Sequence, residues 1–290
     1  MPASPAAARC LALAVLAAIG PARGGGAQTP GGGPGGTSGS TLFRALLADP
    51  KEPQFFAAYL WEHSPRLAPR LGSVGFGQTI AVAGAGAWQV AIAAAVFSQF
   101  NLARPTADLM NTDYRIGLPV TYRHAGLTTR VQLYHQSSHL GDEYMVHANA
   151  QRVDLTFEAA ELLVAQQLAA WRVYGGGEYL LMHSPADLRP GVLHAGVEYR
   201  QPGVLVHFGR LAAGRVVAGL DAKSFEDTGW DVGWSGIAGL ELGDPLARGE
   251  GGAGGWRWSV LLRAYTGPAP YGEFFRDRVR SLGVGLGLAL

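Results

Sequence analysis

The sequence is poor in cysteine and in charged residues. Its one cysteine, Cys10, lies within a predicted export signal, so the mature chain is expected to hold neither disulfides nor a thiolate metal site. Charged residues make up 16% of the chain, below the usual quarter. The formal net charge is only +1, and the composition therefore predicts no nucleic-acid partner.

Helical periodicity is also scarce, and the 42 glycines argue against long helices. One stretch, Ile80 to Phe97, is apolar enough and nearly long enough for a membrane helix. Its residues alternate in size, with large side chains at most even positions and alanines at most odd ones, apart from Gln89 and Phe97. Alternation at period two is typical of strands, so we predict two strands joined at residues 84–86.

Three segments are expected along the chain. Residues 1–27 resemble a secretory signal peptide, with a basic start at Arg9, a short apolar core and a Gly-Gly-Ala cleavage site; the alternative is a buried N-terminal helix. Residues 28–41 form a flexible linker rich in glycine and proline. Residues 42–290 form the main domain, in which residues 42–50 are either a helical turn or an extended segment tucked under it.

Most of the main domain alternates between apolar and polar residues in segments of about ten residues, the length of a tilted membrane-spanning strand. The polar face carries Arg, Asp and Glu too often for a sandwich core, where unpaired charge is costly. A polar lumen with a lipid-facing exterior satisfies both faces. We therefore predict an all-β chain, a transmembrane antiparallel β-barrel of about 12 strands, in the bacterial outer membrane. This location implies the barrel-assembly machinery as a partner.

Connection lengths predict the orientation, because short turns usually face the periplasm and long loops the exterior. The long links place the end of the strand that begins at Leu127 at the cell surface. The links at 201–214 and 243–255 are long, although the order of the strands places them at the periplasmic end. They leave the strand count open by about two. The short links lie near Gly84, Ala125, Gln166 and Thr228, and the long ones at 99–110, 138–149, 183–190 and 268–278.

The strand from Leu127 to Ser137 carries the candidate chemistry. Its apolar face ends in His135 and Ser137, which are two residues apart and therefore about 7 Å apart along one face. A serine hydrolase needs a nucleophile, a base and a group that orients the base. Asn149 has the same parity as Phe157, which predicts that it faces outward at the start of the next strand. We predict Ser137 as nucleophile, His135 as base and Asn149 as orienting residue.

Two alternatives stay open for these residues. Ser138 is a second candidate nucleophile, but its parity points into the lumen. The second alternative is that His135, Ser137 and Asn149 have no catalytic role and are polar residues at the depth of the lipid head groups.

A His-x-Ser pair with an amide or carboxylate one hairpin later resembles outer-membrane phospholipase A and the lipid A deacylases. In those families the serine is the nucleophile, the histidine the base, and an Asn or Glu the third member. The end of the chain, Tyr265 to Glu273 followed by Val284 to Leu286, is similar to the closing hairpin of the phospholipase. In the phospholipase, Asn-Gly follows the serine of the His-x-Ser pair. In this sequence Ser138-His139 follows Ser137.

A closer resemblance, over most of residues 42–290, is to an uncharacterised family of bacterial outer-membrane barrels. It rests on Tyr134 to Glu143, Leu47 to Pro50 and Arg172 to Gly177. The likeness implies the barrel fold and brings no established activity.

Calcium is the one cofactor that the sequence suggests. Asp142 and Glu143 lie beside the candidate site, with Asp108 and Asp113 on the preceding long loop. Carboxylates are ligands that Ca²⁺ prefers, and the phospholipase resemblance implies calcium. The alternatives are solvated loop carboxylates or cation bridges to lipopolysaccharide.

The resulting hypothesis is a serine acyl-ester hydrolase that acts on outer-leaflet lipid, either phospholipid or lipid A. The alternative is a non-enzymatic barrel with a structural or small-solute transport role. The nearly balanced charges of the polar faces favour an ion-pair network that fills the lumen over a selective pore. A monomer and a homodimer both stay open.

Overall fold

The computed structural model describes residues 41–208, 212–243 and 257–289. The predicted signal peptide and nearly all of the predicted linker lie outside these residues. Among the described residues, no helix combines the length and the apolar character needed to cross a membrane.

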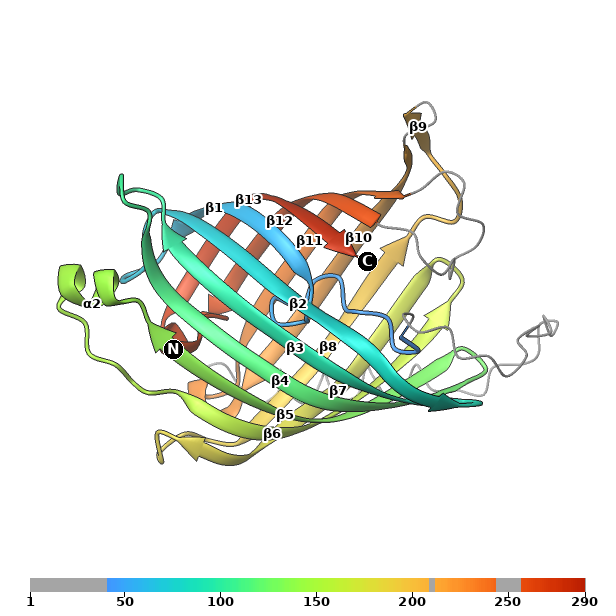
Figure 1. The fold of residues 1–290 in the computed structure, drawn as a ribbon, viewed down its shortest axis with the longest axis horizontal. Helices are drawn as coiled ribbons and strands as arrows, with labels where there is room; N and C mark the ends of the chain where they lie inside the picture. The colour runs from blue at the N-terminus through green and yellow to red at the C-terminus, as the bar shows by residue number, and fades with distance from the viewer. Residues whose placement is uncertain (1–40, 209–211, 244–256, 290) are drawn as a thin grey trace.

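Twelve antiparallel strands close into a barrel, which confirms the predicted fold class (Figure 1). Neighbours in sequence pair around the wall, β8 pairs with β10, and β1 with β13; the short β9 adds three residues to the edge of β10. The strands are β1 Phe55–His63, β2 Arg70–Ala85, β3 Trp88–Asn101, β4 Asp108–His124, β5 Leu127–Leu140, β6 Thr156–Leu168, β7 Trp171–Ser184, β8 Gly191–Arg200, β9 Val206–Phe208, β10 Ala212–Phe225, β11 Asp231–Gly243, β12 Arg257–Pro268 and β13 Arg278–Ala289.

The period-two pattern divides the wall into an apolar exterior and a charged lumen. On β5, Val131 and Leu133 are exposed on the outside, whereas Arg130 and Gln132 are buried inside. The rival membrane helix resolves into the hairpin of β2 and β3, joined by Gly86 and Ala87. Gly86 has a φ of +58°, a conformation that glycine adopts without the steric penalty of other residues.

The two ends of the barrel differ (Figure 1). At one, the turn end, two-residue turns follow β2, β4 and β6. At the other, the loop end, lie connections longer than these turns, together with the helix α2 (Asp142–Ala148) and the short helices η1 (Glu226–Thr228) and η2 (Gly272–Phe274). The short link near Thr228 was grouped with the tight turns of the periplasmic end. It lies instead at the loop end, because β10 ends there. Residues 201–208 of the long link expected at 201–214 lie at the turn end, between β8 and β10. The link expected at 243–255 lies almost wholly outside the described residues.

The residues that precede β1 fill part of the lumen. Residues 42–54 form bends and turns without a helix, and they contact the inner faces of several strands. Phe43 packs under the guanidinium groups of Arg130 and Arg172, 4.5 and 5.0 Å from its ring. Leu46 is fully buried. The segment is therefore not the helical turn that was one of the two alternatives, and it lies inside the barrel.

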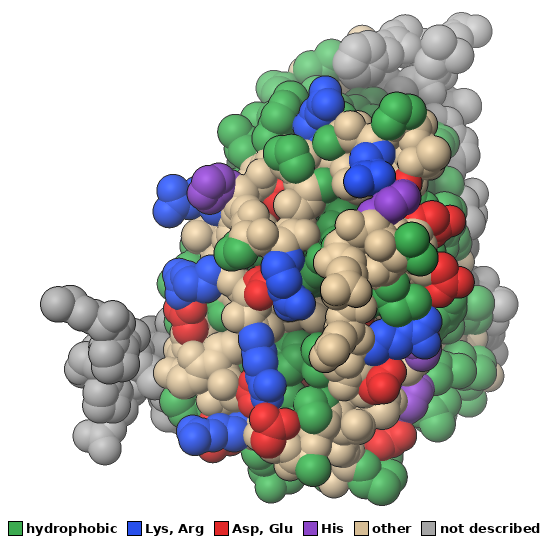
Figure 2. Space-filling model, turned by 90° about the vertical axis from the view of Figure 1, so that its left-hand side faces the viewer, with side chains coloured by type: hydrophobic (Ala, Val, Ile, Leu, Met, Phe, Trp, Pro, Cys, Tyr) green, Lys and Arg blue, Asp and Glu red, His purple; other side chains and the backbone are tan. Residues whose placement is uncertain are grey.

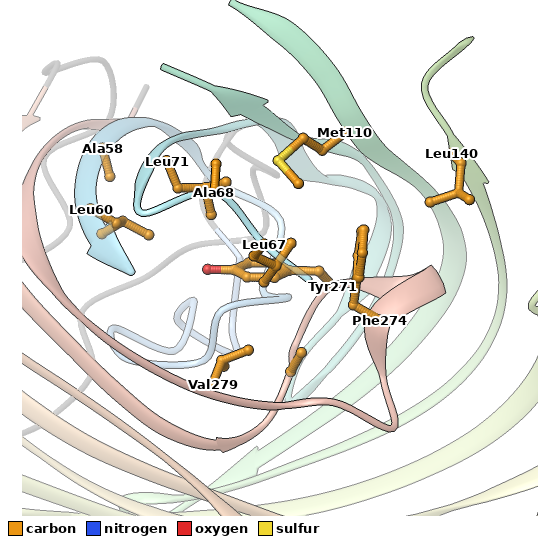
Figure 3. Close-up of a cluster of buried hydrophobic side chains, with 11 residues drawn as sticks. Ala58, Leu60, Leu67, Ala68, Leu71, Met110, Leu140, Tyr271, Phe274 and Val279 are labelled. Carbon is orange, nitrogen blue, oxygen red and sulfur yellow. The ribbon is translucent and has the colours of Figure 1, made fainter. Parts of the chain in front are cut away.

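The loop between β12 and β13 folds over the loop end. Figure 2 views this end, where side chains of both charges, histidines and apolar groups are interspersed. The backbone N–H of Gly272 donates to Asp113, and the Glu273 carboxylate accepts from the N–H groups of Val153 and Leu155. Beneath the loop lies an apolar cluster built around Tyr271, Phe274, Leu67, Leu71, Met110, Leu140 and Val279 (Figure 3).

Candidate active site on the barrel exterior

A histidine and a carboxylate meet on the outer face of β5 and β6. His135 and Glu158 occupy directly opposite positions in the strand pair. The Nδ1 atom of His135 lies 2.9 Å from Oε1 of Glu158, and the two side chains are 43% and 41% exposed. The pair therefore forms a hydrogen bond at the surface of the wall, among exposed apolar side chains such as Leu133 and Ile116.

Ser137 lies on the same face, two residues beyond His135 and nearer the loop end. Its side chain is half-buried, and its strand neighbours are Tyr114 on β4 and Thr156 on β6. Because Glu158 engages Nδ1 of His135, Nε2 is the nitrogen left to accept a proton from the Ser137 hydroxyl. His135 thus lies between Glu158, opposite it across the strand pair, and Ser137, two residues along its own strand, on one face of the wall.

The strand pair is irregular beside Glu158. The register of β6 and β7 shifts there, since Glu158 pairs with Met182 but the next residue, Ala159, pairs with Leu180. The bulge leaves Leu181 and Met182 exposed next to each other on the exterior. Bulges occur often next to active sites, where they redirect side chains. Here the bulge places an apolar surface beside the polar pair.

Asn149 does not lie where the sequence pattern placed it. It ends α2 as the C-cap, with a φ of +49°, and its backbone N–H donates to the carbonyl of Met145. The next strand begins only at Thr156. The position opposite His135 belongs to Glu158, and it is this carboxylate, which the sequence reasoning missed, that bonds the imidazole.

The error has a physical cause in the parity of β6. The apolar residues of a barrel strand were expected to face outward, which placed Phe157 outside and Glu158 inside. In the structure Phe157 packs against Tyr134 at the lumen side, 5.9 Å between ring centroids, and Glu158 faces outward. An apolar cluster inside the barrel and a carboxylate outside it invert the usual pattern. Glu161 could have revealed this from the sequence. It is odd-numbered like Phe157, and a carboxylate placed in the lumen puts the odd-numbered residues of β6 inside and Glu158 outside.

Ser138 and the predicted calcium ligands are also placed. Ser138 is buried in the lumen, as its parity predicted. Asp142 and Glu143 lie exposed in the first turn of α2, and Asp142 Oδ1 is 3.5 Å from the Arg152 guanidinium.

The other two predicted carboxylates are held in separate contacts. Asp108 accepts a hydrogen bond from Nδ1 of His147 at 2.8 Å. Asp113 pairs with Lys51, which belongs to the segment of residues 42–54 inside the barrel, the lumen segment. These contacts place Asp113 inside the barrel.

The lumen of the described barrel holds a dense set of ion pairs. Arg130 joins Glu52 to Glu161, both at 2.8 Å, and Lys223 lies between Asp49 and Glu178, at 3.4 and 3.0 Å. A cavity of about 110 Å³ remains beside this set, toward the loop end. This confirms the lumen-filling arrangement predicted from the balanced charges.

The closed barrel with its apolar exterior defines the protein as a β-barrel of the outer-membrane type. Residues 34–289 match the family described as a protein of unknown function, DUF1207, and the chain belongs to that family. No curated protein is similar enough to the sequence to count as a relative.

Several solved structures share the fold. Outer membrane phospholipase A from Escherichia coli superposes with a TM-score of 0.52 at 13% identity, over 83% of this chain and 93% of that one. The Salmonella typhi outer membrane phospholipase, a dimer with bound calcium, gives 0.52 at 13% identity over 83% and 94%. LpxR from Salmonella typhimurium gives 0.40 at 13% identity over 76% and 88%. At 13% identity, the likeness to the two phospholipase structures shows the fold alone.

Proposed function

We propose that the protein is an outer-membrane serine hydrolase that cleaves acyl esters of outer-leaflet lipid. Ser137 is the nucleophile, His135 the general base, and Glu158 the residue that orients the base, in the role first given to Asn149. The observation that carries the proposal is the hydrogen bond between His135 and Glu158 on an apolar exterior. A polar pair is costly to place on a lipid-facing wall, so its presence beside a serine favours a chemical role.

The proposed reaction gives the two nitrogens of His135 different roles. Nε2 removes the proton of the Ser137 hydroxyl while its oxygen attacks the ester carbonyl. The same nitrogen then protonates the departing alcohol, which leaves an acyl group on Ser137. Water, deprotonated by His135, releases the fatty acid and restores the serine. Glu158 fixes the ring through Nδ1 and stabilises the imidazolium formed in each step.

The position of Ser137 suits a membrane substrate. The residue lies three positions before the end of β5 at Leu140, close to the loop end. Ester bonds of lipids lie at this depth, between acyl chains and head groups, and a substrate could reach the site by lateral diffusion. The exposed side chains of Leu133, Leu181 and Met182 offer contacts for acyl chains.

The transport alternative receives less support from the lumen. Small-solute transport needs a continuous path, and residues 42–54 together with the loop 269–277 occupy the interior of the described barrel. A structural role is the outcome that remains if hydrolysis fails.

The test is acyl release by the refolded barrel in detergent, with phospholipid and lipopolysaccharide as separate substrates. Fatty acid is measured by mass spectrometry for the wild type, Ser137→Ala and Thr129→Ala. Thr129 is a matched control because it lies on the same face of the same strand, roughly 27 Å away. We expect release by the wild type and Thr129→Ala, and none by Ser137→Ala.

A serine-directed fluorophosphonate gives a second readout that does not depend on the substrate chosen. We expect its mass on the peptide that holds Ser137. Absence of both release and labelling in the folded wild type would overturn the proposal in favour of a non-enzymatic barrel.

Calcium and a homodimer are proposed as conditions of activity and are tested in the same assay. Each reaction is run with calcium and with a chelator, and the oligomeric state is followed by light scattering. Activity that survives the chelator would remove Asp142 and Glu143 from the proposal. Activity in a monomer would remove the dimer.

A further inference from the structure

Three metal-binding side chains meet inside the barrel, away from the candidate active site. Glu161 on β6 and Glu178 on β7 occupy directly opposite positions, and His194 lies on β8, opposite Gly176. One ligand atom from each of the three residues lies within 4.8 Å of the other two. Like charges at directly opposite positions destabilise a strand pair unless something compensates them. Here Arg115 and Arg130 compensate Glu161, and Lys223 compensates Glu178, so any further cation has to be argued from the remaining contacts and charges.

Each of these side chains has one polar atom held by the surrounding wall. Oε1 of Glu161 accepts from Nε of Arg130 at 2.8 Å, and Oε2 of Glu178 accepts from the hydroxyl of Tyr134. Nε2 of His194 bonds Oδ2 of Asp221 at 2.6 Å. These contacts fix the direction of all three side chains.

The second polar atom of each side chain lacks a hydrogen-bond partner among the described residues. These atoms are Oε2 of Glu161, Oε1 of Glu178 and Nδ1 of His194. The residues are only 2%, 8% and 2% exposed. A buried polar atom without a partner costs about 1–3 kcal/mol, and more if it is charged. Oε1 of Glu178 nevertheless lies 3.0 Å from Nζ of Lys223, and Oε2 of Glu161 lies 3.7 Å from the Arg115 guanidinium. Nδ1 of His194 has no hydrogen-bond partner among the described residues, and it is this atom that indicates a ligand.

The environment of His194 matches that of a metal-bound imidazole. Its Nε2 faces a carboxylate, which accepts the ring proton and leaves the lone pair on Nδ1. Asp221 is itself held by the hydroxyl of Tyr174 at 2.5 Å. Histidines that bind metals usually donate their other ring N–H to such a carboxylate, which sets the tautomer and the ring direction.

The charges around the site also favour a cation. The contacts around the three side chains join five carboxylates to three cationic side chains, so two negative charges remain if His194 is neutral. The carboxylates are Asp49, Glu52, Glu161, Glu178 and Asp221, and the cations are Arg115, Arg130 and Lys223. A divalent ion restores the balance within this set.

We propose that Glu161, Glu178 and His194 bind a divalent transition-metal ion of the Zn²⁺ class in the lumen. One imidazole nitrogen and two carboxylate oxygens are a donor set that suits Zn²⁺, Mn²⁺ or Fe²⁺. Lys223 contacts Oε1 of Glu178 at 3.0 Å and would turn toward Asp49 when the ion binds. The ion joins β6, β7 and β8 from inside, and β6 is the strand that carries Glu158.

The experiment measures metal content, and it needs no knowledge of the enzymatic activity. The full barrel is refolded with a chelator, exchanged into chelator-free detergent and given ZnSO₄. Bound zinc is then measured by elemental mass spectrometry after gel filtration, and Tm is measured with and without zinc. We expect one zinc per chain and a higher Tm.

Variants locate the site. Glu178→Gln and His194→Gln should lose zinc at the concentration that saturates the wild type. Asp221→Asn should weaken binding about 10–100-fold, the usual effect of removing the carboxylate behind a metal-bound histidine. His124→Gln is the control, because His124 is exposed at the turn end and would report binding by a surface histidine.

Two results would overturn the proposal. One is a folded wild type that takes up much less than one zinc per chain and shows no change in Tm with zinc, manganese or iron. The other is zinc binding that persists in both Glu178→Gln and His194→Gln. If the variants do not fold, the wild-type stoichiometry and Tm shift still decide the question.

Discussion

Ser137 and Ser138 are neighbours in the chain but lie on opposite sides of the barrel wall. Inside, Ser138 belongs to a packed lumen in which acidic and basic side chains contact each other, as Arg130 does with Glu52 and Glu161. Outside, Ser137 lies near one exposed histidine–carboxylate pair, on a wall where apolar side chains such as Leu133 and Ile116 are also exposed. The same strands thus carry two sets of polar groups in very different surroundings.

The difference teaches where stability and chemistry reside. A buried ion pair contributes little net stability, but removing one partner leaves an uncompensated charge and is strongly destabilising. At the head-group depth proposed for His135 and Glu158, where water reaches both side chains, an exposed pair contributes about 0–1 kcal/mol. Stability alone therefore does not require the two residues to meet. Mutations of lumen residues should therefore change folding, whereas mutations of the exterior pair should change activity.

The largest effect is expected for Glu158→Gln. The amide can still contact the imidazole but no longer stabilises the imidazolium or sets its tautomer. Loss of the equivalent carboxylate in a serine protease lowers kcat about 10⁴-fold, and a loss of up to that order is expected in acyl release. The free energy of unfolding should change by less than about 1 kcal/mol.

Acyl release and urea unfolding of the same preparation check this separation. The prediction is wrong if Glu158→Gln lowers the amount of folded barrel and if this loss alone accounts for the lower acyl release.

Arg130→Ala should have the largest effect on stability. The guanidinium holds Glu52 of the lumen segment and Glu161 of β6, so its removal leaves two buried carboxylates without that partner. We expect a loss of about 3–5 kcal/mol in the free energy of unfolding. Arg276→Ala, which removes an exposed guanidinium paired with Asp187 and Asp227, is the control and should change it by less than about 1 kcal/mol. Equal effects of the two substitutions would remove the distinction between lumen and surface.

The barrel was predictable from the sequence because each strand repeats the same apolar and polar alternation. The hairpin of β2 and β3 and the outward direction of His135 and Ser137 both followed from it. The pattern failed on β6, where Phe157 fills an internal apolar cluster and Glu158 faces outward. Strand pairing, which sets Glu158 opposite His135, depends on the length of the preceding loop and cannot be obtained from parity alone.

The loop that closes the lumen should be sensitive to one methyl group. A Cβ at Gly272 would collide with Oγ of Ser138 and with Oδ1 of Asp113, the carboxylate that accepts a hydrogen bond from the Gly272 N–H. Gly272→Ala should therefore destabilise the docked loop by about 1–3 kcal/mol. Gly236→Ala is the control, since the nearest atom, Cδ1 of Leu220, lies at 4.0 Å. Limited proteolysis within residues 269–277 measures the effect, and equal cleavage of both variants would contradict it.

The smallest effect is expected at Asn149, and it decides between the two candidates for the third member of the site. Asn149→Gly removes the amide side chain while keeping the left-handed backbone that ends α2, a conformation glycine favours. If Glu158 orients His135, acyl release by Asn149→Gly should stay within about twofold, and stability within about 0.5 kcal/mol, as for most surface substitutions. A loss of activity comparable to that of Glu158→Gln would mean that α2 moves toward the site during catalysis and that the amide takes part. The comparison is made at saturating substrate, so that weaker lipid binding by the altered loop is not mistaken for lost chemistry.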